Sequence, residues 1–377
     1  MFTKRLSWGI GIACAVLLCS LFVMAVMQAR IAVHKMQSNN NLKQIVLALD
    51  NFESAQRRLP EGCDLEEKHG WQTHIFPFME ASSWYYRLDQ SVGWERPFNY
   101  YKFRLKIPGY QRPSESAVFS AEGYGLTHYL GNPSILYRGS KVKSTELDVG
   151  LSNVWYVGEI GSKYQPFGYP YNWRTLTWPL CAMDGEFGGW SDGAHFGMGD
   201  GAIRFVSSSI DRSVVEQLAN AVATPDRAQM DIPNRSFECG GVEFLRNGMT
   251  FHNEEGRMTK GSSYSEVCFD LEKRAEVIVY RSGQGVKGLG IDLDTLVSRY
   301  SEAQVVDYGA VLDKTAAQKI SRFQNVEALK VGAVEDIEEV IRVLQSLSHL
   351  KFLSGNFNSE LLSQLRVALP GCEISSN

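Results

Sequence analysis

An uncharged, apolar run from Leu6 to Met27 constrains this chain more than any other feature. About 20 helical residues cross the hydrocarbon core of a bilayer, so the run is long enough to span it. Lys4 and Arg5 precede the run and Arg30 follows it. A short basic N-terminus before a large domain usually stays in the cytoplasm. We therefore expect a single-pass protein of the inner (cytoplasmic) membrane, with the bulk of the chain extracytoplasmic.

A cleaved signal peptide is the alternative to a retained anchor. Signal peptides have apolar regions of about 7–15 residues and end at a small-x-small cleavage site. The run here is longer, and the best cleavage candidate, Met27-Gln28-Ala29, has Met at a small position. A lipoprotein signal ending at Cys14 would come too early and lacks the usual Leu. The retained anchor is the preferred interpretation.

The helix is expected to continue beyond the membrane. Leu42, Ile45, Val46, Leu49 and Phe52 follow the i, i+3, i+4, i+7 spacing of one helical face. Neither Pro nor Gly occurs between residues 12 and 59, and the sequence Pro-Glu-Gly at 60–62 ends the run. Residues 1–58 are therefore predicted to form a transmembrane anchor followed by an amphipathic helix that packs on a soluble domain.

The composition excludes several classes of protein. Hydrophobic residues make up 44% of the 377 residues and charged residues 21%, which excludes a disordered chain and predicts two or three domains. With 38 basic and 42 acidic residues the formal net charge is -4. The chain is therefore not expected to bind nucleic acid through its overall charge.

Several separate blocks occur in an order that resembles one family. They are Asn40 to Ile45, Leu59 to Gly62, Gly70 to Glu80, Thr127 to Gly131, Val157 to Gly161 and Asp200 to Val206. The chain resembles the DUF1559 family of pilin-like proteins over residues 10–211, and its architecture resembles type IV pilins and type II secretion pseudopilins. The resemblance implies an α+β fold, with the N-terminal helix packed on an antiparallel β-rich pilin-like domain at residues 59–211. It also implies envelope or secretion-system proteins as partners, and self-association through the N-terminal helix.

The chain departs from that family at functional positions. Ser7 stands where such prepilins carry a Glu, and Phe2 stands where the peptidase needs a Gly. Trp190 replaces the His of the closing signature, and His195 is out of register. Peptidase processing and filament assembly therefore do not follow from the resemblance.

Aromatic residues crowd the segment 155–190, where Gly and Pro are interleaved. Exposed aromatic rings on loops often stack on sugars or partner proteins. The candidate ligand-binding residues are Trp155, Tyr171, Trp173, Trp178 and Trp190. The alternative, which we prefer, is that most of these rings cover a thin β-sheet core.

Acidic residues in a Gly-rich stretch are candidate calcium ligands, because Ca²⁺ prefers carboxylate oxygens. They are Asp184, Glu186, Asp192 and Asp200, with His195 nearby. The stretch lacks the spacing of an EF-hand, and three of its Asp residues precede Gly, which is typical of turns. Turns are the preferred interpretation, and no other cofactor is predicted.

Catalytic constellations are poor in this sequence. It has no H-E-x-x-H or C-x-x-C, and its seven His residues are scattered. We name no catalytic residue and do not expect an enzyme. Five Cys lie outside the membrane run, and Cys239 and Cys268 are the candidate disulfide pair.

From residue 275 onward the pattern changes to short strands that alternate with helices. The predicted strands are 276–280, 304–308, 327–331 and 351–353, and the predicted helices are 293–300, 315–323, 337–347 and 359–369. Gly309, Gly332 and Gly355 recur at intervals of 23 residues. One strand and one helix in such a period are typical of a leucine-rich repeat. Residues 275–377 are therefore predicted to form a small α/β leucine-rich-repeat-like domain, and residues 212–274 a linker or irregular β region.

A dinucleotide-binding fold is the alternative for this region. Residues 283–288 match G-x-G-x-x-G after a strand, and Asp307 lies near the end of the next strand. The units are short for βαβ units of about 30 residues, so the repeat is preferred. Its sheet face would either bind protein or stabilise the preceding domain.

Together these features predict a membrane-anchored extracytoplasmic protein with a structural or protein-interaction role in the cell envelope or a secretion-related assembly. The alternative is an envelope binding protein for a glycan or small solute that uses the aromatic residues of segment 155–190.

Overall fold

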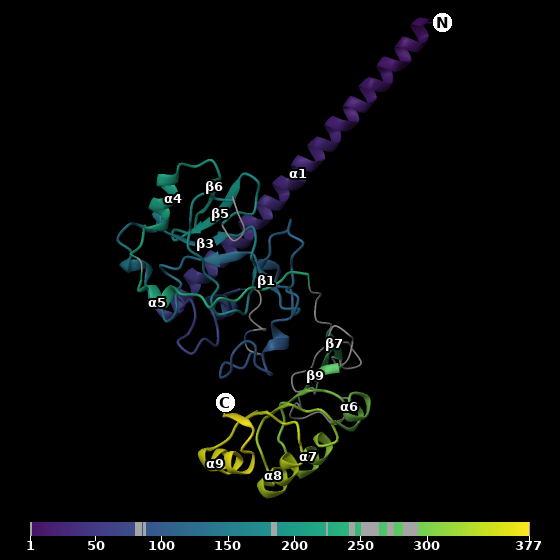
Figure 1. Cartoon of the computed structure of the whole chain (residues 1–377), viewed down its shortest axis with the longest axis vertical. Coiled ribbons are helices and arrows are strands. Elements are labelled where there is room, and N and C mark those ends of the chain that lie inside the picture. Colours follow the sequence, from purple (N-terminus) through teal and green to yellow (C-terminus); the bar gives the residue numbers. More distant parts are fainter. Residues whose placement is uncertain are drawn as a thin grey trace.

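The fold is mixed α+β, with one long N-terminal helix and β-sheets in two separate bodies (Figure 1). The computed structural model describes residues 2–79, 85, 88–181, 187–223, 225–240, 246–249, 264–269, 275–281 and 293–376. The helix, the first body and the second body follow one another along the long axis of the molecule (Figure 1).

Helix α1, Phe2–Gln56, is unbroken, as the sequence predicted. In its first part every large apolar side chain described is exposed, from Val16 to Met27. In its second part Leu42, Ile45 and Leu49 are fully buried. The stretch Val16–Gln56 is long and apolar enough to cross a membrane. None of the residues in its most apolar section is buried. The helix ends where Arg57 takes a left-handed φ of 62°.

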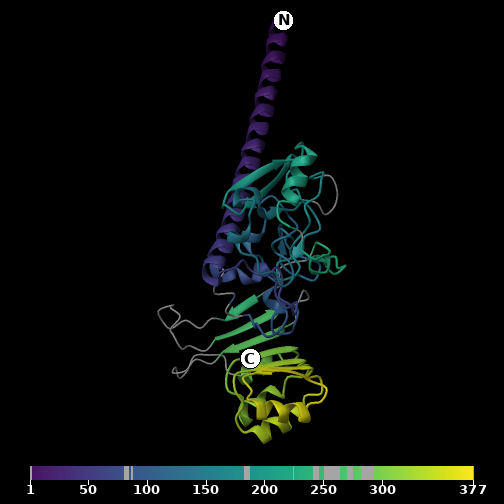
Figure 2. The same cartoon turned by 90° about the vertical axis from the view of Figure 1, so that its left-hand side faces the viewer.

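The first body is built on a four-stranded antiparallel sheet in the order β2-β3-β5-β6. The strands are β2 (Tyr129–Gly131), β3 (Trp155–Glu159), β5 (Gly193–Met198) and β6 (Ile203–Ser207). The second part of α1 lies against this sheet (Figure 2). A second, two-stranded antiparallel sheet pairs β1 (Leu126–Thr127) with β4 (Gln165–Pro166). The expected antiparallel sheets are therefore present.

Short helices and loops complete the first body. The helices are α2 (Trp71–His74), α4 (Arg212–Ala219) and α5 (Arg227–Met230), and the 3-10 turns are η1 (Phe76–Phe78), η2 (Tyr100–Lys102), η3 (Pro108–Tyr110), η4 (Ser144–Glu146) and η5 (Leu151–Asn153). Because the sheet is small, aromatic rings from these loops fill much of the core around α1.

The second body is a seven-stranded sheet in the order β13-β12-β11-β10-β9-β8-β7. Its strands are β7 (Arg246–Met249), β8 (Tyr264–Phe269), β9 (Ala275–Arg281), β10 (Val305–Tyr308), β11 (Ala328–Val331), β12 (Phe352–Gly355) and β13 (Glu373–Ser376). Strands β9 to β13 are parallel, whereas β7 and β8 pair antiparallel. The helices between them are α6 (Leu293–Arg299), α7 (Lys314–Ile320), α8 (Ile337–Gln345) and α9 (Ser359–Ala368). The predicted alternation of strand and helix is confirmed, and β7 and β8 lie in the segment predicted as a linker or irregular β region.

The two faces of this sheet have different partners. One face, with Val306, Leu329 and Leu353, packs against α6 to α9. On the other face Val277, Val305 and Ala328 pack against Phe98 and Tyr101 of the first body. Figure 2 shows the strands lying between their helices and the first body. This patch of the sheet face is therefore covered by the same chain.

Ion pairs surround that apolar contact between the bodies. Lys330 of β11 donates to Asp89 at 2.5 Å, and Arg96 lies 3.2 Å from Glu373. Burial alone raises the pKa of Asp89, but hydrogen bonds from Lys330 and Ser91 outweigh it and hold the pKa below its usual value. The Asp89–Lys330 pair is mostly buried, whereas the Arg96–Glu373 pair is half-exposed.

Two smaller expectations have different outcomes. The pairing of Cys239 with Cys268 is wrong, because Cys239 is a free thiol. Its backbone forms an isolated antiparallel β-bridge with Ser120 of the first body, whereas Cys268 lies in β8 of the other sheet. The glycine motif at 283–288 lies outside the described residues.

Candidate functional site

The junction between α1 and the sheet centres on a buried carboxylate. Glu159 ends β3 and has no exposed surface. Its Oε2 accepts from the Trp190 Nε1–H at 2.9 Å and the His195 main-chain N–H at 2.6 Å, and the His195 Nδ1 lies 2.9 Å away. Ser38 of α1 donates to its Oε1, and the Tyr129 hydroxyl lies 2.8 Å from the Ser38 Oγ. Ser38 and Glu159 together therefore join the helix to β2, β3 and β5.

A second contact lies about one turn earlier on α1. The Lys35 Nζ donates to both carboxylate oxygens of Asp192 at 2.8 Å. It also lies 4.7 Å from the ring centroid of Phe205 and 5.6 Å from that of Trp190. Lysine over an aromatic face gains cation–π attraction, so this edge of the sheet holds α1 near the expected membrane boundary.

The histidine of the block Thr127 to Gly131 is held inside the body. Its Nδ1 accepts the main-chain N–H of Arg112 at 2.9 Å, and its Nε2 lies 2.9 Å from the Ala117 carbonyl. Burial lowers the pKa of His128 to about 4. His128 is therefore neutral near pH 7 and orders the chain around Arg112.

The five candidate aromatic residues are not gathered in one place. Tyr171 and Trp173 are buried in the core around α1, and Trp190 is half-buried against Glu159. Trp155 is buried at the start of β3, and Trp178 is 44% exposed on a loop. Trp155 and Trp178 line one cavity together.

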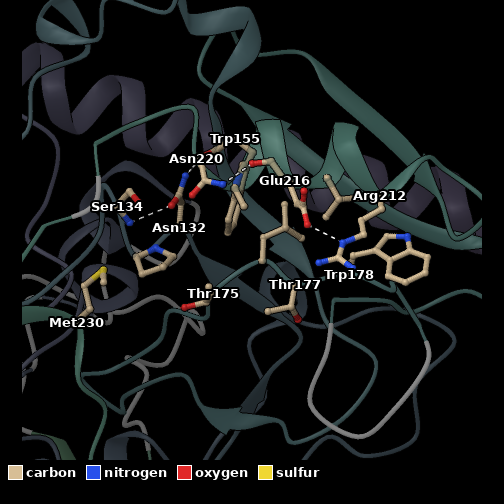
Figure 3. Close-up of a pocket in the computed structure, with 14 residues that line it drawn as sticks. Asn132, Ser134, Trp155, Thr175, Thr177, Trp178, Arg212, Glu216, Asn220 and Met230 are labelled. Carbon is tan, nitrogen blue, oxygen red and sulfur yellow. Dashed lines mark hydrogen bonds and ion pairs between the residues drawn. The ribbon is translucent and has the colours of Figure 1, made fainter. Parts of the chain in front are cut away.

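That cavity has a volume of about 330 Å³ (Figure 3). Its lining residues are Asn132, Pro133, Ser134, Trp155, Thr175, Leu176, Thr177, Trp178, Arg212, Val215, Glu216, Ala219, Asn220 and Met230. They come from the loop after β2, the start of β3, the loop around Thr175 to Trp178, and helices α4 and α5. Asp211 caps α4 by accepting from the main-chain N–H of Ser213, which begins the helix at the wall of the cavity.

Polar contacts order the cavity wall. The Arg212 Nε donates to Glu216 at 2.6 Å, and the Arg212 guanidinium lies 5.9 Å from the ring centroid of Trp178. Asn132 donates to the Trp155 carbonyl at 2.8 Å and accepts from the Ser134 main-chain N–H at 3.0 Å. The wall therefore has a fixed polar side and an aromatic edge.

Sequence reasoning missed the non-aromatic residues of this cavity. Arg212 and Glu216 have the i, i+4 spacing of an ion pair on a helix, but that spacing also describes any solvated helix face. Nothing in the sequence around Asn132 indicated that its loop would lie beside α4.

The candidate calcium ligands are dispersed. Asp184 and Glu186 lie outside the described residues. Asp192 is paired with Lys35, and Asp200 accepts from the Ala202 main-chain N–H at 3.0 Å in a turn. Within the described ranges, no group of three or more His, Cys, Asp or Glu side chains could hold a metal ion. The calcium site stays a prediction.

Comparison with protein-family models finds one match. Residues 27–175 match the model of a family described as a protein of unknown function (DUF1559). The matched range contains the docked part of α1 and strands β1 to β4. No curated protein and no solved structure matches the chain.

Proposed function

We propose that this chain, whose residues 27–175 are a DUF1559 domain, is a membrane-anchored extracytoplasmic protein with a structural or protein-interaction role in the cell envelope or a secretion-related assembly. In this proposal the domain is pilin-like, and the first part of α1 spans the inner membrane. The second body serves as a leucine-rich-repeat-like extension of the domain.

The observation that carries the proposal is the division of α1. From Val16 to Met27 the helix presents exposed apolar side chains all round, whereas from Leu42 to Leu49 it buries one face in the domain. A helix that is apolar on every side needs an apolar environment on every side. The described residues of the chain provide no apolar environment around residues 16–27, whereas a bilayer would provide one.

The boundary between the two parts supports the same placement. Arg30, His34 and Lys35 follow the apolar run, and Lys35 already contacts the sheet. At 1.5 Å per residue, Lys35 lies about 12 Å beyond Met27. Basic and aromatic side chains such as Lys35 and Trp190 are typical of the membrane–water interface. The domain would therefore lie directly on the membrane surface.

The 23-residue spacing and the sequential order of β9 to β13 support the repeat-like assignment of the second body. Its contact with residues 98–101 favours a stabilising role for that part of the sheet face.

Extraction of membranes with alkaline carbonate tests the anchor. We expect the protein to stay in the pellet, and its domain to be digested when protease is added to spheroplasts. A double variant, Leu18→Arg with Leu21→Arg, should be released, because each Arg near a helix centre costs about 3 kcal/mol of insertion energy. Leu47→Arg is the matched control, since Leu47 is equally exposed but lies on the docked part.

Two results would contradict the proposal. One is release of the unaltered protein by carbonate, and the other is protection of its domain from protease in spheroplasts. Cross-linking in intact cells then tests for envelope or secretion-system partners and for self-association through α1.

A further inference from the structure

We propose that the cavity between α4 and the loops at Asn132 and Thr175 to Trp178 binds a neutral saccharide. This inference goes beyond the proposed anchoring role and does not depend on it. It takes up the glycan-binding alternative with a definite site and a definite ligand class.

The size and position of the cavity suit a small ligand. Its volume of about 330 Å³ is at the lower end of the range of small-molecule sites, about 300–1,000 Å³. Its walls come from segments that the fold holds in place, because Val215 of α4 and Trp155 of β3 are both buried in one apolar cluster. Binding would therefore need little reorganisation of the chain.

The aromatic edge provides the apolar contact that a sugar ring needs. Trp178 is 44% exposed, unlike the buried Trp155 and Trp173. The C–H groups on one face of a sugar ring pack on an aromatic face of this kind. Leu176 and Val215 extend the apolar lining next to it.

The rest of the lining supplies uncharged hydrogen-bonding groups. Hydroxyls come from Ser134, Thr175 and Thr177, and amides come from Asn132 and Asn220 (Figure 3). Hydroxyls and amides both donate and accept, which matches the hydroxyl groups of a saccharide.

The charges of the lining argue for a neutral ligand. Arg212 and Glu216 are the charged side chains among the described lining residues, and they pair with each other at 2.6 Å. An anionic ligand would have to displace Glu216 and would meet its negative charge. A neutral ring can instead lie against the pair and accept from the free N–H groups of the guanidinium.

The test is equilibrium binding to the full chain in a detergent without a sugar headgroup, because maltoside detergents would compete for the site. The probes are glucose, galactose, mannose and N-acetylglucosamine. Their binding is measured by isothermal titration calorimetry and saturation-transfer NMR. Glucose 6-phosphate is the charged comparison.

We expect saturable binding of at least one neutral probe. Trp178→Ala should weaken it about tenfold or more, and Trp178→Phe should retain most of it. Phe205→Ala is the matched control, since Phe205 is a similarly exposed ring that does not line the cavity, and it should bind like the unaltered protein. Circular dichroism confirms that each variant is folded.

Three results would overturn the proposal. They are the failure of every neutral probe to bind saturably, unchanged binding by Trp178→Ala, and tighter binding of glucose 6-phosphate than of glucose.

Discussion

The two parts of α1 both carry large apolar side chains but have opposite surroundings. Between Val16 and Met27 the apolar side chains point in every direction and are exposed. Between Leu42 and Leu49 the buried apolar side chains lie on one face of the helix: Leu42, Ile45 and Leu49 are fully buried, whereas Leu47 is 57% exposed. The difference shows that the distribution of apolar residues around the helix indicates which partner each part has.

The docked part also has polar contacts that the first part lacks among its described side chains. Ser38 donates to the buried Glu159, and Lys35 pairs with Asp192. A buried carboxylate is tolerated only where several donors surround it, so this contact fixes the position of α1 along the sheet. In the proposed anchor, the first part of α1 needs no such register.

The largest expected effect comes from truncating a docked leucine. Leu49→Ala should lower the free energy of unfolding by about 2–5 kcal/mol, because it removes buried methyl groups and leaves a cavity. Leu47→Ala, two residues away on the exposed face, should change it by about 0.5 kcal/mol or less. Urea unfolding of the full chain in detergent, followed by near-UV circular dichroism, measures both. Equal effects would remove the distinction between the two faces.

Glu159→Ala should have the next largest effect and lower the free energy of unfolding by about 3 kcal/mol. It leaves the donors of Trp190, His195 and Ser38 buried without an acceptor. Glu159→Gln keeps an acceptor oxygen for Trp190 and His195 and should lose less. The same unfolding measurement applies, and an alanine variant as stable as the glutamine variant would contradict the role of the carboxylate in holding α1.

The junction between the two bodies should respond more weakly. Lys330→Met should cost about 2 kcal/mol, because Asp89 is left buried with its Ser91 hydrogen bonds alone. Lys351→Met is the control: Lys351 pairs with Glu327 on the exposed rim of the same sheet, and its loss should cost less than about 1 kcal/mol. Thermal unfolding by calorimetry shows whether the second body separates from the first.

The same junction should weaken in acid. The folded pKa of Asp89 is lower than its unfolded value of about 3.9, so its contribution to stability is present above that value. The contribution is lost as the pH falls through the folded pKa. Lys330→Met should therefore lose this acid dependence, and an unchanged pH profile in the variant would contradict the assignment.

The smallest effect is expected at Asp50, at the end of the docked part. Burial, with the nearby charge of Glu53, raises the pKa of Asp50 to about 6. A raised carboxyl pKa costs stability as the pH rises from the unfolded value of about 4 to the folded value, because the folded state holds its proton more tightly there. The full cost remains above the folded value. Asp50→Asn should therefore stabilise the protein at pH 8 by about 1 kcal/mol, after allowance for solvent screening, and leave it unchanged at pH 4. Urea titrations at both pH values measure this, and equal effects would contradict it.

Periodicity and spacing made much of this fold predictable. The continuity of α1 follows from the lack of Pro and Gly between residues 12 and 59 and from one apolar face, and β10 to β12 with their helices follow from glycines that recur every 23 residues. The last strand, β13, was not predicted, although it extends the same alternation of strand and helix after α9. These features are local, so a single sequence contains them.

The contacts that depend on distant residues could not be predicted in this way. Lys330 and Asp89 are far apart in the chain, and their pairing depends on how the second body lies on the first. Trp155 and Trp178 were predicted among five aromatic residues, but no local signal separates Trp178 from the buried Trp173. The cavity needs α4, whose place beside those loops is a property of the whole fold.

Intact mass and N-terminal sequencing of the protein recovered from membranes test the central claim most directly. We predict a membrane-bound chain that retains residues 16–27, with the unmodified, uncut N-terminus of a permanent anchor. A soluble chain that begins near Ile31 would show that the apolar run is a cleaved signal, and would contradict the division of α1 between bilayer and domain.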